Sequence, residues 1–343
     1  MLHLLCILLI VLLLLLGLSL LNSYVSKDIN LAHCKIIVFS EEVASEGISK
    51  EIFTFVNDIQ LRPDTCVIVS RCDAKDYIEN IKPDLESSVS QYYEITEESN
   101  IYTGFTDYLT IGDFYNCLSS NCCDGYAILG GINNGENKNV ADEPSDSEND
   151  LAIKSSETPF SDEPSSENVG IAVFKDDKLV GELDAIQSIC HLIVTDKFKS
   201  TVIPIKNPLD SNSTIDLYLY GPKKTKINVD IVNGAPYVTV DCKLRARVVS
   251  IDNISKDTSN DDETIDSITK AASEYLTQHI YDYLYTTCKI YKSDISKIGK
   301  SAVKNFSTNE KWENFDWLNN YKNSFFKVTA DVNVKSGLIL TEN

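Results

Sequence analysis

The chain has 343 residues, with 31 Lys and Arg against 51 Asp and Glu, so its formal net charge is −20 at pH 7. This charge disfavours a nucleic-acid partner, because binding DNA or RNA requires clustered cations that neutralise phosphates. Hydrophobic residues make up 43% and charged residues 24%, which excludes wholesale disorder. A mean hydropathy of −0.13 excludes a polytopic transporter. The length corresponds to about two domains.

Residues 1–21 form an apolar segment. Between Leu2 and Leu21 only His3 and Ser19 are polar. A helix of this length spans about 30 Å, enough to cross the hydrocarbon core of a membrane. A helix buried in a protein core is the alternative, but such a helix normally carries a polar stripe. We therefore expect a membrane or export role for this segment.

The apolar segment lacks the features of a cleaved or lipidated signal. No Lys or Arg precedes Lys27, and no A-x-A pattern follows the segment. A lipoprotein would carry a small residue immediately before a cysteine at the end of the apolar run. Cys6 lies at its beginning instead, and Cys34 follows the bulky His33. Both are poor lipidation candidates, so lipidation stays unknown and we interpret the run as an uncleaved anchor or a damaged signal.

Ten cysteines would favour disulfides in an exported protein. Their spacing is less favourable. Cys66 and Cys72 are separated by five residues, and four residues separate Cys117 from the Cys122–Cys123 pair. No C-x-x-C motif occurs and no cysteine pair lies near a histidine pair, which argues against zinc. We expect most of the cysteines to pack as small hydrophobic side chains.

Residues 22–132 alternate between strand and helix patterns. Apolar runs at 34–39, 65–70 and 125–132 predict three buried strands. Apolar residues at helical spacing follow the first strand, and Asp73 can cap a short helix after the second. The pattern indicates a partial N-terminal domain of α/β type.

Residues 133–168 differ sharply in composition. They include ten acidic residues, two lysines and three prolines. Such a segment buries too little apolar surface to offset the entropy lost on ordering. We expect an acidic linker without fixed structure.

Residues 169–343 have the pattern of a second domain. A hairpin is predicted at 170–183, followed by a helix at 182–194. Alternating apolar and polar residues then predict antiparallel strands, the clearest of them at 238–248. Its polar face carries Lys243, Arg245 and Arg247.

The apolar face of this predicted sheet requires a cover. An amphipathic helix is expected at 264–291, with apolar residues on one stripe and acidic residues at its N-terminus. A closing strand is expected at 328–334. We therefore predict an α+β fold with an incomplete first domain and a C-terminal antiparallel sheet covered by a long helix.

The sequence contains no recognisable catalytic constellation. None of its four histidines belongs to an H-E-x-x-H motif, and no G-x-S-x-G motif is present. Gly130 and Gly131 follow a strand but lead into the acidic segment, so they form no phosphate loop. His191 and His279 fall on predicted helices beside apolar residues, and we expect both to be partly buried in the core. The sequence thus predicts a protein that is not an enzyme and holds no cofactor or metal.

The C-terminal residues resemble the end of the Ger(x)C family, the C-type lipoprotein subunits of spore germinant receptors. In that family a long helix precedes an Asp-containing turn that ends in Gly, two spaced tryptophans, an alternating strand and a terminal Gly. The corresponding places are filled, in the same order, by Asp294, Gly299, Trp312, Trp317, the 328–334 strand and Gly337. The stretch 169–184 is similar to the hairpin that opens the family's C-terminal domain.

The N-terminal part also resembles this family. The stretch 29–76 is similar to the later half of the family's N-terminal domain, and the apolar run precedes it almost directly. The resemblance therefore implies a member that is truncated at its N-terminus, with a first sheet short of strands. A misplaced start, a deletion or a degenerate paralogue would each explain such a chain.

The resemblance implies a non-catalytic, membrane-attached subunit of a nutrient germinant receptor, on the outer side of the spore inner membrane. It also implies two integral membrane partners, the A-type and B-type subunits, and a role in receptor assembly or signalling. We expect Lys243, Arg245 and Arg247 to form a contact surface, with an ordinary solvated face as the alternative. A second interpretation is an exported solute-binding lipoprotein that captures a small ligand directly. A thiol-redox protein, the third, rests on the cysteine count alone.

Overall fold

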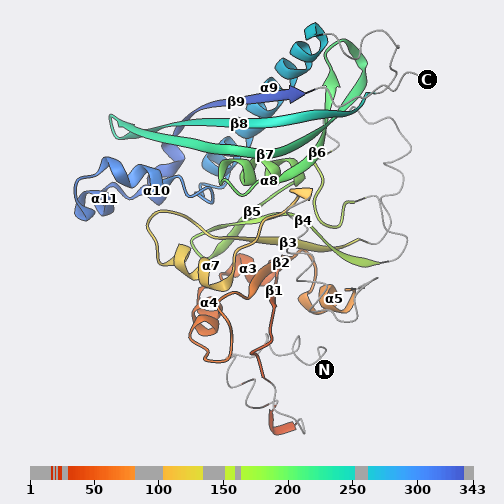
Figure 1. Ribbon diagram of the computed structural model, residues 1–343. Coiled ribbons are helices and arrows are strands. Elements are labelled where there is room, and N and C mark those ends of the chain that lie inside the picture. Colours follow the sequence, from red (N-terminus) through yellow and green to blue (C-terminus); the bar gives the residue numbers. More distant parts are fainter. Residues whose placement is uncertain are drawn as a thin grey trace.

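A computed structural model of the chain describes five stretches, with a few isolated positions before residue 25: 30–81, 103–133, 151–158, 164–251 and 262–335. They form a five-stranded and a four-stranded sheet with helices packed against both (Figure 1). The predicted α+β fold is confirmed.

The apolar segment 1–21 lies outside the described residues, apart from Gly17 and Leu20. No helix within the described stretches is long and apolar enough to cross a membrane.

The first sheet has the order β1-β2-β3-β4-β5. Its strands are β1 (Ile36–Ser40), β2 (Cys66–Ser70), β3 (Tyr126–Asn133), β4 (Ser165–Lys175) and β5 (Lys178–Leu183). The first three pair in parallel, which requires a crossover between consecutive strands. The described parts of these crossovers contain α3 (Glu41–Glu46), α4 (Ser49–Val56), α5 (Ala74–Glu79) and α7 (Ile111–Leu118).

Capping side chains fix where these helices begin. Ser40, Asp73 and Thr110 precede α3, α5 and α7, and each accepts a hydrogen bond from a backbone N–H of the first turn. The predicted cap at Asp73 is therefore present. It directs α5 across the sheet so that the buried Tyr77 packs in one cluster with Ile68.

The hairpin of β4 and β5 belongs to the first sheet, whereas we expected it to open a separate domain at residue 169. β4 pairs antiparallel with β3 over most of its length. The physical reason is that β3 would otherwise present an unpaired edge. The sheet thus continues across the boundary that composition suggested.

Part of the expected acidic linker is also folded against this sheet. The Ser155 side chain is fully buried, donates to the Leu129 carbonyl at 2.8 Å and accepts the Val169 N–H at 2.7 Å. The prediction of a linker without fixed structure over 133–168 is therefore wrong for 151–158 and for the strand residues from Ser165. Composition did not predict that these stretches are ordered, because they are held by a few long-range hydrogen bonds and not by a local apolar pattern.

The second sheet has the order β6-β7-β8-β9. Its strands are β6 (Ser200–Asn207), β7 (Asp210–Val232), β8 (Ala235–Ile251) and β9 (Phe325–Lys335). The long helix α9 (Asp262–Tyr285) packs along β9 with Ile268, Leu276 and Ile280 buried, as predicted. A π-helical turn, Thr286–Ile290, follows α9.

The closing strand β9 runs parallel to β8, so the second sheet is not purely antiparallel as expected. α9 returns the chain to the end of the sheet from which β8 started, and a helical crossover of this kind joins parallel strands. Shorter helices lie between α9 and β9: α10 (Gly299–Ala302), α11 (Asn309–Phe315) and α12 (Trp317–Asn320).

Helix α8 (Ala185–Val194) lies between the two sheets (Figure 1). All of its residues except Gln187 are buried, and it contacts β4, β8 and α9. Asp184 caps it through a capping box with Gln187. Apolar residues of both sheets consequently form one continuous core.

Candidate functional site

Asp294, Gly299 and Trp317, which the family resemblance singled out, lie together in the structure. Asp294 is fully buried. Its carboxylate accepts the backbone N–H groups of Ile298 (3.0 Å) and Gly299 (2.8 Å), and the Trp317 indole Nε1 donates to it at 2.8 Å. One carboxylate therefore ties the start of α10 to α12.

Gly299 and Trp312 complete this cluster. A Cβ at position 299 would lie 2.3 Å from the Cys122 carbonyl oxygen and 2.7 Å from the Trp317 Nε1, so the close approach requires glycine. Trp312 stacks on Trp317 with ring centroids 5.9 Å apart, and both side chains are buried. The aromatic segment is thus core, not an exposed surface. Gly337 lies outside the described residues.

Asp124, just before β3, links the first sheet to the Asp294 turn. Its N–H donates to the Asp294 carbonyl at 3.1 Å, and its Oδ2 accepts the Asp294 N–H at 2.9 Å. Lys175 Nζ lies 3.3 Å from the same oxygen. Burial raises the pKa of Asp124, although Lys175 opposes the shift, and burial raises the pKa of Asp294 to about 6. The junction of the two sheets thus contains two buried carboxyl groups.

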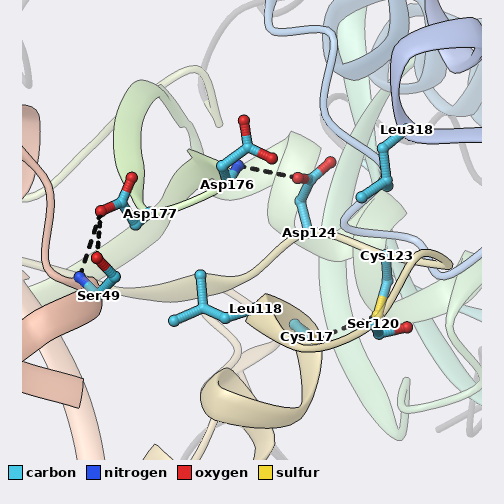
Figure 2. Close-up of a pocket in the computed structure, with 9 residues that line it drawn as sticks. All are labelled: Ser49, Cys117, Leu118, Ser120, Cys123, Asp124, Asp176, Asp177 and Leu318. Carbon is cyan, nitrogen blue, oxygen red and sulfur yellow. Dashed lines mark hydrogen bonds between the residues drawn. The ribbon is translucent and has the colours of Figure 1, made fainter. Parts of the chain in front are cut away.

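A cavity of about 280 Å³ opens beside Asp124 (Figure 2). Its lining also includes Asp176, Asp177, Ser49, Cys117 and Cys123. Asp177 Oδ2 accepts the Ser49 hydroxyl at 2.6 Å, so this carboxylate anchors α4. No His, Lys or Arg is among the lining residues, and nothing there resembles a nucleophile–base pair. Within the described residues no group of three or more His, Cys, Asp or Glu is placed to hold a metal ion.

A second buried polar cluster surrounds His191 on α8. Its Nδ1 lies 2.8 Å from the Tyr283 hydroxyl of α9, and its Nε2 lies 3.2 Å from Asp107 Oδ2. Asp107 also accepts the Tyr126 hydroxyl at 2.5 Å and Lys197 Nζ at 2.8 Å. Sequence patterns predicted that His191 is partly buried in the core, and the structure shows it fully buried. Nothing in the sequence indicated these distant partners.

The two titratable groups of the His191 cluster have shifted pKa values of different origin. Burial lowers the pKa of His191, although Asp107 opposes the shift, so the ring is neutral near pH 7. Burial by itself raises the pKa of Asp107, but the adjacent His191 ring and the Lys197 charge outweigh it and lower this pKa to about 2. The cluster therefore contains an ionised carboxylate beside a neutral imidazole.

His191 is expected to make the protein less stable as the pH falls from 7.5 to 5.5. Because the pKa of His191 is lowered in the folded chain, the unfolded chain takes up more proton at this histidine in that range than the folded chain does, so acidification favours unfolding. In the His191→Gln variant this contribution is absent. Urea unfolding at several pH values should therefore show a smaller loss of stability on acidification for the variant than for the wild type. Equal losses would contradict the buried neutral imidazole.

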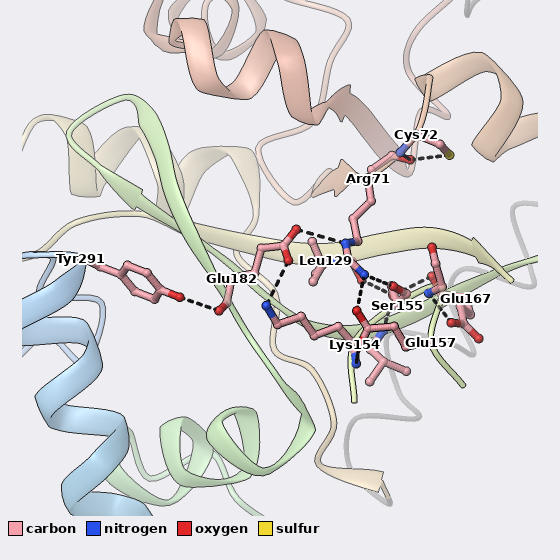
Figure 3. A network of polar contacts seen from close by, with 12 residues as sticks. Arg71, Cys72, Leu129, Lys154, Ser155, Glu157, Glu167, Glu182 and Tyr291 are labelled. Atoms are coloured by element: carbon pink, nitrogen blue, oxygen red, sulfur yellow. Dashed lines mark hydrogen bonds and ion pairs between the residues drawn. The ribbon is translucent and has the colours of Figure 1, made fainter. Parts of the chain in front are cut away.

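A third polar network joins the end of β2 to the segment 151–158 (Figure 3). Arg71 Nη1 donates to the Ser155 carbonyl at 2.6 Å and pairs with Glu157 at 2.9 Å. Its Nε lies 3.3 Å from Glu182 on β5, which also pairs with Lys154 at 3.2 Å. Sequence reasoning missed this network because Arg71 lies more than 80 residues before each of its partners.

The polar face of the second sheet carries the predicted cationic strip. Arg247 lies over the Tyr218 ring and Arg245 over the Tyr220 ring, 4.9 Å and 5.4 Å from their centroids. Lys243 pairs loosely with Asp331 at 3.8 Å. The three cations are exposed and form one row along β8.

Of the two cysteines considered for lipidation, the structure describes Cys34. Cys34 is half-buried, and its Sγ donates to the Ile36 carbonyl at 3.2 Å. Burial raises the pKa of its thiol. Cys6 lies outside the described residues.

Family models of known proteins match both parts of the chain. Residues 169–337 match the family described as "Spore germination B3/ GerAC like, C-terminal", and residues 15–129 match "Spore germination protein N-terminal domain". The chain belongs to the Ger(x)C family of spore germination proteins. Membership in this family makes it a spore germinant-receptor subunit, and such receptors are membrane-associated complexes.

A solved structure shares the fold of this Ger(x)C chain. It is titled "Crystal Structure of the GerBC protein" and superposes with a TM-score of 0.60 at 16% sequence identity, over 88% of this chain and 79% of that chain. A comparison with curated proteins gives no match. At this identity the structural similarity shows a common fold.

Proposed function

We propose that this Ger(x)C chain is a non-catalytic, membrane-attached subunit of a nutrient germinant receptor, acting in receptor assembly or signalling with the A-type and B-type membrane subunits. The observation that carries the proposal is the match of the family models to both parts of the chain. The buried Asp294 and His191 clusters support it, because Asp294 and the Nδ1 of His191 make hydrogen bonds between distant segments of the fold. In this role the folded part supplies surfaces, not chemistry.

The proposal assigns membrane attachment to residues 1–21. Their length and apolar composition fit a tether, with the folded part on the outer side of the spore inner membrane. Fractionation of spores that carry the full chain tests this assignment. Deletion of residues 2–21 should move the protein out of the membrane fraction.

We further propose that Lys243, Arg245 and Arg247 contact a partner subunit. They form a row of exposed cations on a protein of net charge −20, and the tyrosines beneath two of them fix their position. An ordered cationic row suits an acidic surface on a partner, where charge complementarity increases association rate and specificity.

Reversing Arg245 and Arg247 to Glu is expected to reduce co-purification of the membrane subunits at least tenfold and to delay germination. The reason is that two attractive pairs become repulsive ones. The matched control is Lys270→Glu with Lys304→Glu, which changes the charge equally at exposed positions away from this face. Unchanged assembly in the Arg245 and Arg247 variant, at wild-type protein level, would reject the contact surface.

The alternative proposal, an exported solute-binding lipoprotein, requires a ligand pocket. Such pockets are mostly apolar and have volumes of about 300–1,000 Å³. The cavity beside Asp124, at about 280 Å³ and with three aspartates in its lining, fits this description poorly. Calorimetry with amino acids and sugars separates the two roles, since saturable binding to the isolated chain would favour the alternative.

A further inference from the structure

Cys117 and Cys123 face each other in the lining of the cavity beside Asp124 (Figure 2). Their Sγ atoms are 3.2 Å apart. Cys117 lies in the last turn of α7 and Cys123 lies just before β3, so the two thiols bracket the loop that connects these elements. A disulfide bond is about 2.05 Å long, which means that closure requires the sulfur atoms to approach by roughly 1 Å.

We propose that Cys117 and Cys123 form a dithiol site that a low-molecular-weight disulfide oxidises to an intramolecular disulfide. The site is a modification site that the receptor role does not use, and it stands independently of that role.

The orientation of the two thiols gives each a part in the reaction. The Cys123 thiol donates a hydrogen bond to Cys117 Sγ. This bond, together with Lys297 and Lys300, lowers the pKa of Cys117 despite its burial, so Cys117 is the nucleophile. Although both residues are more than nine-tenths buried, their sulfur-bearing side chains line the cavity, which gives a small reagent a route to them.

The reaction balances as two successive thiol–disulfide exchanges. The Cys117 thiolate attacks one sulfur of the reagent RSSR, forms a mixed disulfide and releases RS⁻. Cys123 then loses its proton and attacks Cys117 Sγ, which forms the protein disulfide and releases the second RS⁻. The two protons from the protein thiols end on two molecules of RSH, so the protein is oxidised by two electrons and the reagent is reduced by two.

Cys122 is the obvious competitor, but its surroundings disfavour it. It is half-buried, burial raises the pKa of its thiol, and its carbonyl faces Gly299. A disulfide that includes Cys123 instead fixes the residue next to Asp124. Asp124 is hydrogen-bonded to the backbone of Asp294. The disulfide would therefore tie α7 to the junction of the two sheets.

The test uses the full chain in detergent, treated with oxidised glutathione, unfolded, alkylated with iodoacetamide and analysed by mass spectrometry. The wild type should carry two fewer alkyl groups than its ten cysteines allow. The peptide that contains residues 117–123 should be lighter by about 2 Da than its reduced form. Closure should raise the Tm by about 3–6 °C, reversibly with dithiothreitol.

Three Cys→Ser variants decide between the possible pairs. Cys122→Ser should close as the wild type does, whereas Cys117→Ser and Cys123→Ser should keep both remaining thiols of the loop alkylatable. Ten alkylated cysteines in the treated wild type would overturn the proposal. So would a disulfide in Cys123→Ser, because it would assign the pair to Cys117 and Cys122. Thiol counts on the unfolded chain do not depend on how well a variant folds after treatment. If the Cys117→Ser and Cys123→Ser variants are unstable, comparison of the wild-type chain and the Cys122→Ser variant suffices.

Discussion

Replacing Asp294 with asparagine is expected to lower the free energy of unfolding by about 3–5 kcal/mol. Three N–H donors converge on the carboxylate, and two of them, from Gly299 and Trp317, share Oδ2. An amide nitrogen in the place of Oδ2 is itself a donor and cannot accept these hydrogen bonds. The buried N–H groups of Gly299 and Trp317 would therefore lose their acceptor. Guanidinium unfolding followed by tryptophan fluorescence measures the loss.

The pH dependence of the difference between wild type and Asp294→Asn provides a second readout. The pKa of Asp294 is raised to about 6 in the folded chain, so its protonation favours folding. The stabilising contribution is complete below the unfolded value of about 4 and is lost as the pH rises through about 6. The deficit of the variant should therefore widen as the pH falls from 7 to 5.

The control for this prediction is Asp230→Asn, an equal change at an exposed position of β7. It should change stability by no more than about 0.5 kcal/mol. If Asp294→Asn changed the free energy of unfolding by as little, the Asp294 carboxylate would not be what holds the start of α10 to α12.

The Asp107→Asn variant is expected to be destabilised by about 3–4 kcal/mol. Asp107 is almost fully buried, and it balances Lys197 while accepting the Tyr126 hydroxyl. The substitution removes the negative charge of Asp107 but leaves the Lys197 ammonium group and the Tyr126 hydroxyl in place. Because the folded pKa of Asp107 is about 2, its contribution is present above the unfolded value and fades as the pH falls towards 2.

A double-mutant cycle with Lys197→Met isolates the charge pair in this cluster. The methionine keeps most of the aliphatic stem and removes the ammonium group that lies 2.8 Å from Asp107. Removing both charges should cost less than the sum of the single changes, by about 1–3 kcal/mol. Additive effects would show that Lys197 and Asp107 do not stabilise each other.

Local patterns in the sequence determined the element types. The period-two alternation at 238–248 identified β8, and helical spacing over 264–291 identified α9, because side-chain periodicity follows directly from the backbone geometry of each element. The family resemblance selected Asp294, Gly299 and Trp317, which the structure brings into contact. The resemblance rests on the order of these residues along the chain and contains no information on their contacts.

The length predicted two domains and the composition predicted an acidic linker, and the tertiary structure folds part of that linker and the following hairpin onto the first sheet. The first sheet takes β4 and β5 across the expected boundary, and Ser155 and Arg71 fold part of the acidic segment onto that sheet. The parallel direction of β9 likewise depends on where α9 returns the chain.

The sequence by itself therefore determined the type of the strongly periodic elements, such as β8 and α9, and the family that the chain resembles. Only the tertiary structure decided which strands share a sheet and which buried groups meet, such as Asp107 with His191 and Cys117 with Cys123. The physical reason is that periodicity is set by neighbours in the chain, whereas edge pairing and buried hydrogen bonds are set by groups that are distant in sequence or oriented by the packing around them.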